Sequence, residues 1–159
     1  MNTKNKDYIS LALWIMSLIA IGSIIGYLTK GSISGWYGTL NRSPLTPPNY
    51  VFSIVWSILY AMIATSGWLI WNSKNFPQLE LIKKLYIFQL ILNWSWMPLF
   101  FGYQLINIAL MCLSALTILV ALLIAQTYKK ITTASLLLVP YLLWLLFATY
   151  LNFYICHNN

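Results

Sequence analysis

Aromatic rings and neutral amides recur at helical spacing in three apolar segments of this sequence. The members of each set lie three or four residues apart, so each set would share one face of a helix. The sets are Phe52, Trp56 and Tyr60; Gln89, Asn93, Trp96 and Phe100; and Trp144, Ala148 and Asn152. Indole and phenyl faces stack on flat apolar molecules, and a few amides can orient such a guest. These residue types predict a binding surface for a planar apolar ligand.

Two asparagines indicate the direction in which these faces point. Asn93 and Asn152 fall in apolar segments, and an amide at membrane depth must face protein or a cavity because lipid cannot satisfy it. Trp96 and Trp144 would turn inward with them. The amides could instead serve only to join helices, a common use of polar groups in membranes. Ala148, one turn from Trp144, favours a ligand-binding cavity over simple helix contact, because a small residue leaves room beside a large ring.

The residues of conventional catalysis are few and poorly placed. The acids are Asp7 and Glu80, and the one histidine is His157, near the C-terminal end. Cys112 and Cys156 lack metal-ligand spacing. Because there is no carboxylate pair, no metal cluster and no ionisable group at mid-membrane, we expect no hydrolytic centre, no metal site, no required cofactor and no ion-coupled pump.

The elements that carry these residues are membrane helices. The chain has 159 residues, of which 60% are hydrophobic and 7% charged, whereas soluble domains carry about 25% charged residues. We therefore expect a single all-α integral membrane domain, 1–159, folded as a five-transmembrane-helix bundle. The predicted spans are 8–28, 47–71, 81–101, 105–127 and 133–155, with a long loop between the first two. Aromatic residues near span ends, as at Trp14, Trp71 and Tyr86, are typical of the membrane interface.

The basic residues lie near the ends of these spans and are divided unequally between the two sides. One side would carry most of them: Lys4, Lys6, Lys74, Lys83, Lys84, Lys129 and Lys130. The other side has only Lys30 and Arg42. Because cytoplasmic loops are enriched in lysine and arginine, we expect a cytoplasmic N-terminus and a C-terminus outside. No basic face is left for nucleic acid, despite a net charge of +7.

Five longer motifs, in order along nearly the whole chain, resemble the tryptophan-rich sensory protein and translocator protein family, also called peripheral-type benzodiazepine receptors. The motifs are WYGTL at Trp36 to Leu40, PLTPPNYVF at Pro44 to Phe52, VWSILY at Val55 to Tyr60, LNWSWMPLFFG at Leu92 to Gly102 and PYLLWLLFATYLN at Pro140 to Asn152. The resemblance implies a five-helix bundle with a cavity open toward the first loop. It also implies a homodimer, which is usual in the family.

The same resemblance implies a membrane receptor or sensor for porphyrins, such as protoporphyrin IX and other haem-pathway intermediates, and for benzodiazepine-type ligands. Positions that match cavity residues of the family are Trp56, Asn93, Trp96, Trp144 and Ala148, with Trp36, Tyr37 and Tyr60 nearby. Phe100 and Asn152 join the predicted site because they share the inward faces. Arg42 or Lys30 at the cavity mouth could pair with a porphyrin carboxylate.

Other functions stay open at this point. Some bacterial members of the family promote light- and oxygen-dependent breakdown of protoporphyrin, and the tryptophans that match Trp56 and Trp144 are implicated as catalytic residues. The chain could also be a passive carrier of tetrapyrroles or similar small amphiphiles. A scaffold whose aromatic residues only pack against one another is the remaining alternative.

The sequence departs from the family in its last two spans. Phe153 stands where animal members have the tyrosine of a cholesterol motif, and His157 stands where they have its basic residue. Ile108 replaces a tryptophan that is frequent early in the fourth span. The broken sterol motif favours a bacterial inner-membrane protein over a mitochondrial one.

Overall fold

The computed structural model describes residues 3–159, and all of their side chains except those of residues 3–5, 33 and 34. Within this part the chain forms no strand. Five helices are long and apolar enough to cross a membrane, which confirms the predicted all-α five-helix membrane bundle. The helices are α1 (Thr3–Ser34), α2 (Trp36–Thr39), α3 (Asn49–Trp71), α4 (Leu79–Met97), the π-helical turn η1 (Pro98–Gly102), α5 (Ile106–Thr127) and α6 (Thr132–Asn158).

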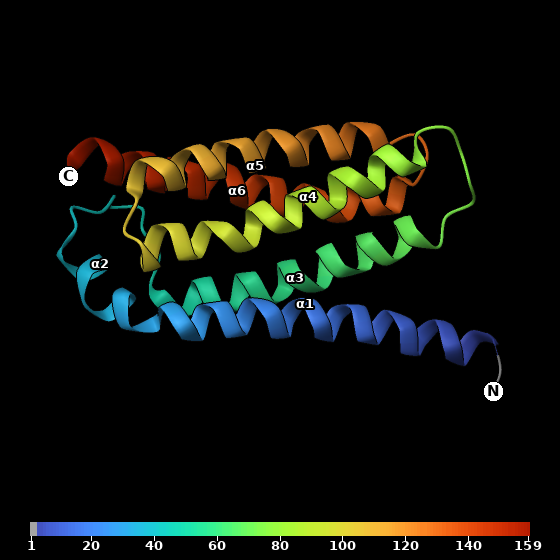
Figure 1. The fold of residues 1–159 in the computed structure, drawn as a ribbon, viewed down its shortest axis with the longest axis horizontal. Helices are drawn as coiled ribbons and strands as arrows, with labels where there is room; N and C mark the ends of the chain where they lie inside the picture. The colour runs from blue at the N-terminus through green and yellow to red at the C-terminus, as the bar shows by residue number, and fades with distance from the viewer. Residues whose placement is uncertain (1–2) are drawn as a thin grey trace.

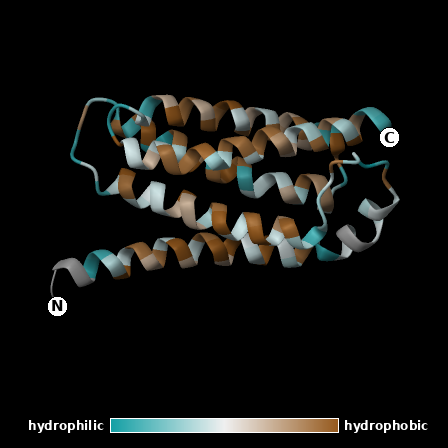
Figure 2. Cartoon of the chain, turned by 180° about the vertical axis from the view of Figure 1, so that it is seen from behind, coloured by the Kyte–Doolittle hydropathy of each residue, from teal (hydrophilic) through white to brown (hydrophobic). Residues whose placement is uncertain are grey.

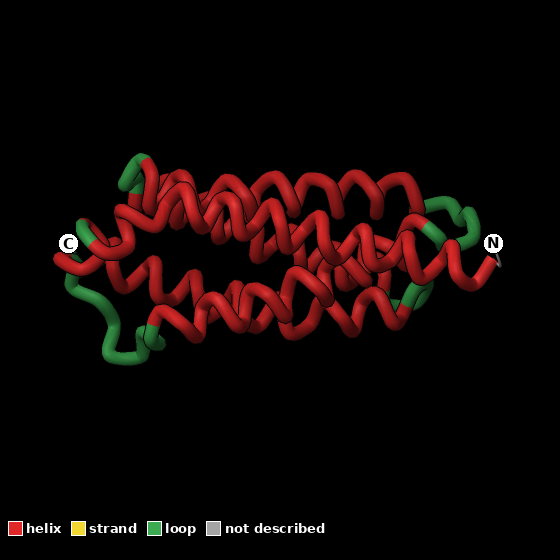
Figure 3. The backbone as a smooth tube through the Cα atoms, turned by 90° about the horizontal axis from the view of Figure 1, so that it is seen from below, coloured by secondary structure: helices red, strands yellow, loops and turns green. Residues whose placement is uncertain are grey.

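The five long helices run along the long axis of an elongated bundle (Figure 1). α1 packs on α3, α3 also packs on α6, and α5 contacts both α4 and α6. The short helix α2 lies at the same end as the C-terminus, and the chain begins at the opposite end (Figures 1 and 3). We call these two ends of the bundle the α2 end and the N-terminal end. Hydrophobic residues dominate the middle of the helices, whereas most hydrophilic residues lie at the two ends (Figure 2).

Helix ends differ from the predicted spans where polar residues find partners within the helix. The first helix continues to Ser34 instead of ending at Leu28. Thr29 explains part of this extension, because its hydroxyl donates to the carbonyl oxygens of Ile25 and Gly26, at 3.0 and 3.2 Å. Sequence reasoning also missed α2, which occupies part of the predicted loop. That loop is therefore partly helical.

An aromatic cluster joins α1, α3 and α4 near the N-terminal end. The ring centroids of Trp14 and Trp71 lie 5.3 Å apart, and those of Trp71 and Tyr86 lie 5.6 Å apart. Tyr86 is fully buried, and its hydroxyl donates to the Ile63 carbonyl oxygen at 2.8 Å. The prediction that Tyr86 lies at the membrane interface is therefore wrong. Gly67 makes this packing possible, since a Cβ there would overlap Tyr86 and Trp14.

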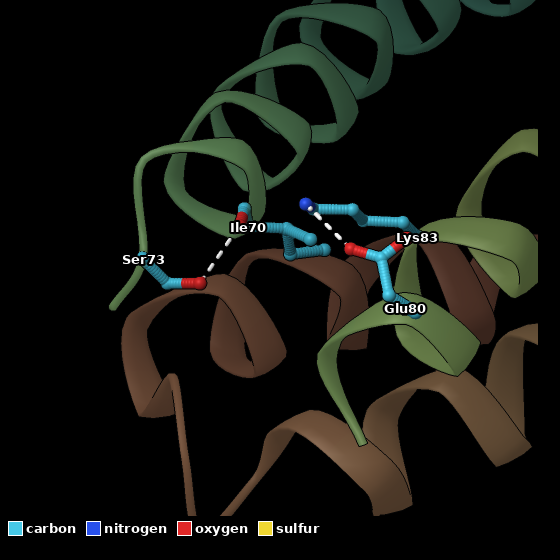
Figure 4. Close-up of polar contacts among 4 residues, drawn as sticks. All are labelled: Ile70, Ser73, Glu80 and Lys83. Carbon is cyan, nitrogen blue, oxygen red and sulfur yellow. Dashed lines mark hydrogen bonds and ion pairs between the residues drawn. The ribbon is translucent and has the colours of Figure 1, made fainter. Parts of the chain in front are cut away.

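The first turn of α4 holds one of the chain's two acids, Glu80. Figure 4 shows Lys83 donating to Glu80 at 2.9 Å, and the Ser73 hydroxyl donating to the Ile70 carbonyl oxygen at 2.8 Å. The first contact is an exposed pair one turn apart, so it adds little to stability. The pair lies at the N-terminal end of the bundle, where α4 begins, and not at the α2 end.

Candidate functional site

A cavity of about 660 Å³ lies between α1, α3, the α4–η1 segment and the last turns of α6. We call it the aromatic pocket. Its volume falls within the range of about 300–1,000 Å³ that is usual for ligand sites. Most of the predicted site residues line it: Tyr37, Trp56, Tyr60, Asn93, Trp96, Phe100, Ala148 and Asn152. The fold thus brings the members of all three sequence stripes to one cavity, except Gln89 and Trp144.

Aromatic rings form facing parts of the pocket wall. On α3, the ring centroids of Trp56 and Tyr60 lie 5.5 Å apart. On the α4–η1 segment, Trp96 and Phe100 are also 5.5 Å apart, with planes only 20° from parallel. Tyr37 from α2 meets the Phe100 ring edge-on at 6.1 Å and so covers this end of the pocket. The wall offers flat apolar surfaces to a guest.

A chain of hydrogen bonds fixes the polar part of this wall. The Tyr60 hydroxyl donates to Asn93 Oδ1 at 2.8 Å, and Asn93 Nδ2 donates to the Tyr141 hydroxyl at 2.8 Å. Tyr141 donates in turn to Gln89 Oε1 at 3.2 Å, beyond the pocket. Asn93 therefore joins α3, α4 and α6. It also lines the cavity, so this amide joins helices and faces the pocket at the same time.

Asn152 plays a similar part at the α2 end. Its Oδ1 accepts a hydrogen bond from the Trp96 indole at 3.1 Å, and its Nδ2 donates to the Ile106 carbonyl oxygen at 3.3 Å. The first bond fixes the orientation of an indole that lines the pocket. With Ala148 one turn earlier on α6, Asn152 completes the wall that this helix supplies.

Apart from Lys30, which was predicted at the cavity mouth, sequence reasoning missed the contribution of α1 to the pocket. Gly22 and Gly26 line the pocket, and Lys30 lies at its α2 end. A Cβ on Gly22 would overlap the Tyr60 ring, whereas a Cβ on Gly26 would meet Met97 Cε at an ordinary 3.9 Å. The small-residue spacing of Gly22 and Gly26 was visible in the sequence and is typical of close helix approach. Here it lets α1 pass close to Tyr60 within one chain.

Three predicted site residues do not line the aromatic pocket. Trp144 contacts the ring of Phe52 edge-on at 5.6 Å, and Phe52 does line the pocket. Trp36 packs edge-on against Phe100 at 5.6 Å. Arg42 lies beside the pocket, with its guanidinium 5.1 Å from the centroid of the Tyr37 ring.

The chain is similar to known proteins over most of its length. The sequence model of the TspO/MBR family matches residues 13–157. The tryptophan-rich protein TspO of Archaeoglobus fulgidus is 37% identical over 147 residues, covering 92% of this chain and 95% of that protein. The protein of the same name from Chlorobaculum tepidum is 36% identical, covering 98% and 99%. The translocator protein of Homo sapiens is 34% identical, covering 88% and 85%.

Proposed function

Because this chain belongs to the TspO/MBR family, we propose that it is a membrane receptor that binds porphyrins, with protoporphyrin IX as the test ligand, and benzodiazepine-type molecules in the aromatic pocket. The observation that carries the proposal is the cavity of about 660 Å³ between the Trp56–Tyr60 and Trp96–Phe100 walls. Flat aromatic guests stack on such faces. The side-chain amides of Asn93 and Asn152, which hydrogen bonds to Tyr60 and Trp96 hold in place, would form a polar edge of the site beside the ligand.

Replacing Trp56 with phenylalanine is expected to weaken protoporphyrin binding severalfold, because a phenyl ring offers a smaller stacking face than an indole. Titration with protoporphyrin, followed by quenching of intrinsic tryptophan fluorescence, measures the effect. Trp68→Phe is the matched control, since Trp68 lies on the same helix but does not line the pocket. Equal affinities of the two variants, or no saturable quenching in the wild type, would contradict the proposal.

A second candidate function, light-driven breakdown of bound porphyrin, is favoured by the position of Trp56 in the pocket wall. An indole is oxidisable, and here it would touch the photoexcited ring. We expect illuminated protoporphyrin to bleach faster with the wild type than without protein, in the presence of oxygen. Trp56→Phe should slow bleaching more than Trp144→Phe, because Trp56 lines the pocket and Trp144 does not. Bleaching rates that do not depend on the protein would exclude this function.

The protein is an integral membrane protein, and we propose that it lies in a bacterial inner membrane with the α2 end outside. Lys74, Lys83 and Lys129 mark the N-terminal end as cytoplasmic, while the side chain of Lys4 lies outside the described residues. A membrane-impermeant maleimide should label Leu45→Cys in intact cells but not Lys74→Cys, after replacement of both native cysteines by serine. The reverse pattern would overturn this orientation. Association as a homodimer remains a prediction.

A further inference from the structure

A second hollow, of about 780 Å³, lies at the α2 end. We call it the polar basin. Amide, hydroxyl and guanidinium groups from the segment between α2 and α3, from the start of α3 and from the end of α6 line it, among them Asn41, Arg42, Ser43, Asn49, Tyr154 and Asn158. Its lining contrasts with the aromatic pocket, which is walled mainly by rings and aliphatic side chains.

The polar basin adjoins the aromatic pocket. Asn49 lines both hollows. Arg42 lines the basin, and its guanidinium stands 5.1 Å from the centroid of the Tyr37 ring, which lines the pocket. The guanidinium of Arg42 thus lies next to the wall of the aromatic pocket, separated from it by the Tyr37 ring.

The segment that carries Arg42 is fastened to α6. The backbone N–H of Asn41 donates to Asn159 Oδ1 at 2.9 Å, and Asn41 Nδ2 donates to the Asn158 carbonyl oxygen at 3.1 Å. Asn159 Nδ2 returns a bond to the Asn41 carbonyl oxygen at 3.3 Å. Two residues further on, the hydroxyls of Ser43 and Tyr150 are 3.1 Å apart. The basin thus has a wall held at two points.

Among the described residues, no carboxylate lies within ion-pair distance of Arg42. The chain contains two acids, and Glu80 is paired with Lys83 at the N-terminal end, while Asp7 lies in the first turns of α1. The Lys83–Glu80 contact is the one ion pair among the described residues. Burial raises the pKa of Tyr37, an effect that the nearby Arg42 opposes, so the phenol is neutral at pH 7 and does not offset the charge of Arg42. Arg42 is exposed and lines the basin, so its charge is accessible to an anion that enters the basin.

We propose that the polar basin receives a carboxylate of the ligand whose flat body occupies the aromatic pocket, with Arg42 as its donor. The Arg42 guanidinium lies 5.1 Å from the Tyr37 ring centroid and also interacts with the Tyr37 hydroxyl. A guanidinium has five N–H donors, so those not used by Tyr37 can donate to a carboxylate. The proposal rests on the proposed function and narrows its ligand class to acidic aromatic amphiphiles. Lys30, which lines the pocket at the same end, adds a second positive charge to this end.

The test compares protoporphyrin IX with its uncharged dimethyl ester in a non-ionic detergent at low salt. We expect the wild type to prefer the diacid, and we expect Arg42→Gln to reduce that preference by about tenfold, as the loss of a charge-assisted hydrogen bond predicts. The affinity for the ester should hardly change. The wild type and Arg42→Gln are titrated with the same two ligands. Differences in ligand solubility therefore cancel when the diacid-over-ester preferences of the two proteins are compared. Lys74→Gln, which removes an equal charge at the N-terminal end, is the control and should leave the preference intact.

Each outcome decides a separate question. An unchanged preference in Arg42→Gln, with both ligands still bound, would overturn the role of the basin and leave the aromatic pocket as the porphyrin site. If Arg42→Gln instead releases co-purified anionic phospholipid and leaves the preference unchanged, the basin takes a lipid phosphate and the proposal is wrong. Failure of the wild type to bind either ligand would overturn the proposed function itself.

Discussion

Replacing Gly22 with alanine is expected to weaken protoporphyrin binding by about tenfold or more. The added Cβ would overlap the Tyr60 ring, so that ring must move into the pocket or away from Asn93. Overpacking of this kind costs about 1–3 kcal/mol, and each 1.4 kcal/mol is a factor of about ten in affinity. Fluorescence titration measures the effect, with thermal unfolding of the ligand-free protein as a check on folding.

Gly26→Ala is the matched control for this experiment. Gly26 lies one turn further along α1 and also lines the pocket, but its new Cβ would meet only Met97 at 3.9 Å. A double variant isolates the cause further, because Gly22→Ala should have little effect once Tyr60→Val has removed the ring. Equal losses from Gly22→Ala and Gly26→Ala would show that the approach of α1 to Tyr60 does not shape the pocket.

Replacing Asn93 with leucine is expected to destabilise the protein by about 1–3 kcal/mol, the usual cost of leaving a buried polar group without its partner. The variant deprives the Tyr60 hydroxyl of its acceptor and the buried Tyr141 hydroxyl of a donor. At roughly 2–4 °C per kcal/mol for a chain of this size, the melting temperature in detergent should fall by several degrees.

Asn49→Leu provides the comparison for Asn93→Leu, because Asn49 is exposed and no hydrogen bond of its side chain is described. Adding Tyr60→Phe to Asn93→Leu should recover part of the lost stability, since it removes a hydroxyl that has no acceptor. A melting temperature as low for Asn49→Leu as for Asn93→Leu would mean that the Tyr60–Asn93–Tyr141 chain does not hold the helices together.

Periodicity and polarity made much of the pocket predictable. Trp56 and Tyr60 share one face because they lie four residues apart on α3, and Asn93 had to turn inward because lipid cannot satisfy an amide. The same reasoning placed Trp96, which stays inside with Asn152 as its partner. These inferences need only helix geometry and the chemistry of the bilayer.

The positions that could not be predicted depend on how the helices meet. α1 carries no polar stripe to show which face looks inward, so its contact with Tyr60 through Gly22 was not readable. Trp144 lies one turn from Ala148, yet it packs against Phe52 from α3 and does not line the pocket, whereas Phe52 does. Periodicity gives the direction of a side chain from its own helix but does not say which residue of a neighbouring helix lies in front of it.

The polar basin was equally hidden in the sequence. Its wall forms because Asn41 bonds to Asn158 and Asn159, more than a hundred positions away along the chain. Polar residues in a proline-rich loop show no periodic pattern, so their partners emerge only from the fold. Arg42 was identified as a carboxylate partner, but its separation from the pocket by Tyr37 was not.

The most direct test of a ligand site between α1, α3, α4 and α6 is an experimental structure of the wild-type protein with bound protoporphyrin IX. The ring is expected inside the bundle, within about 4 Å of the Trp56 and Trp96 side chains, with a carboxylate directed toward Arg42. A porphyrin seated on the lipid-facing surface or between two copies of the chain, with the aromatic pocket left vacant, would contradict the account.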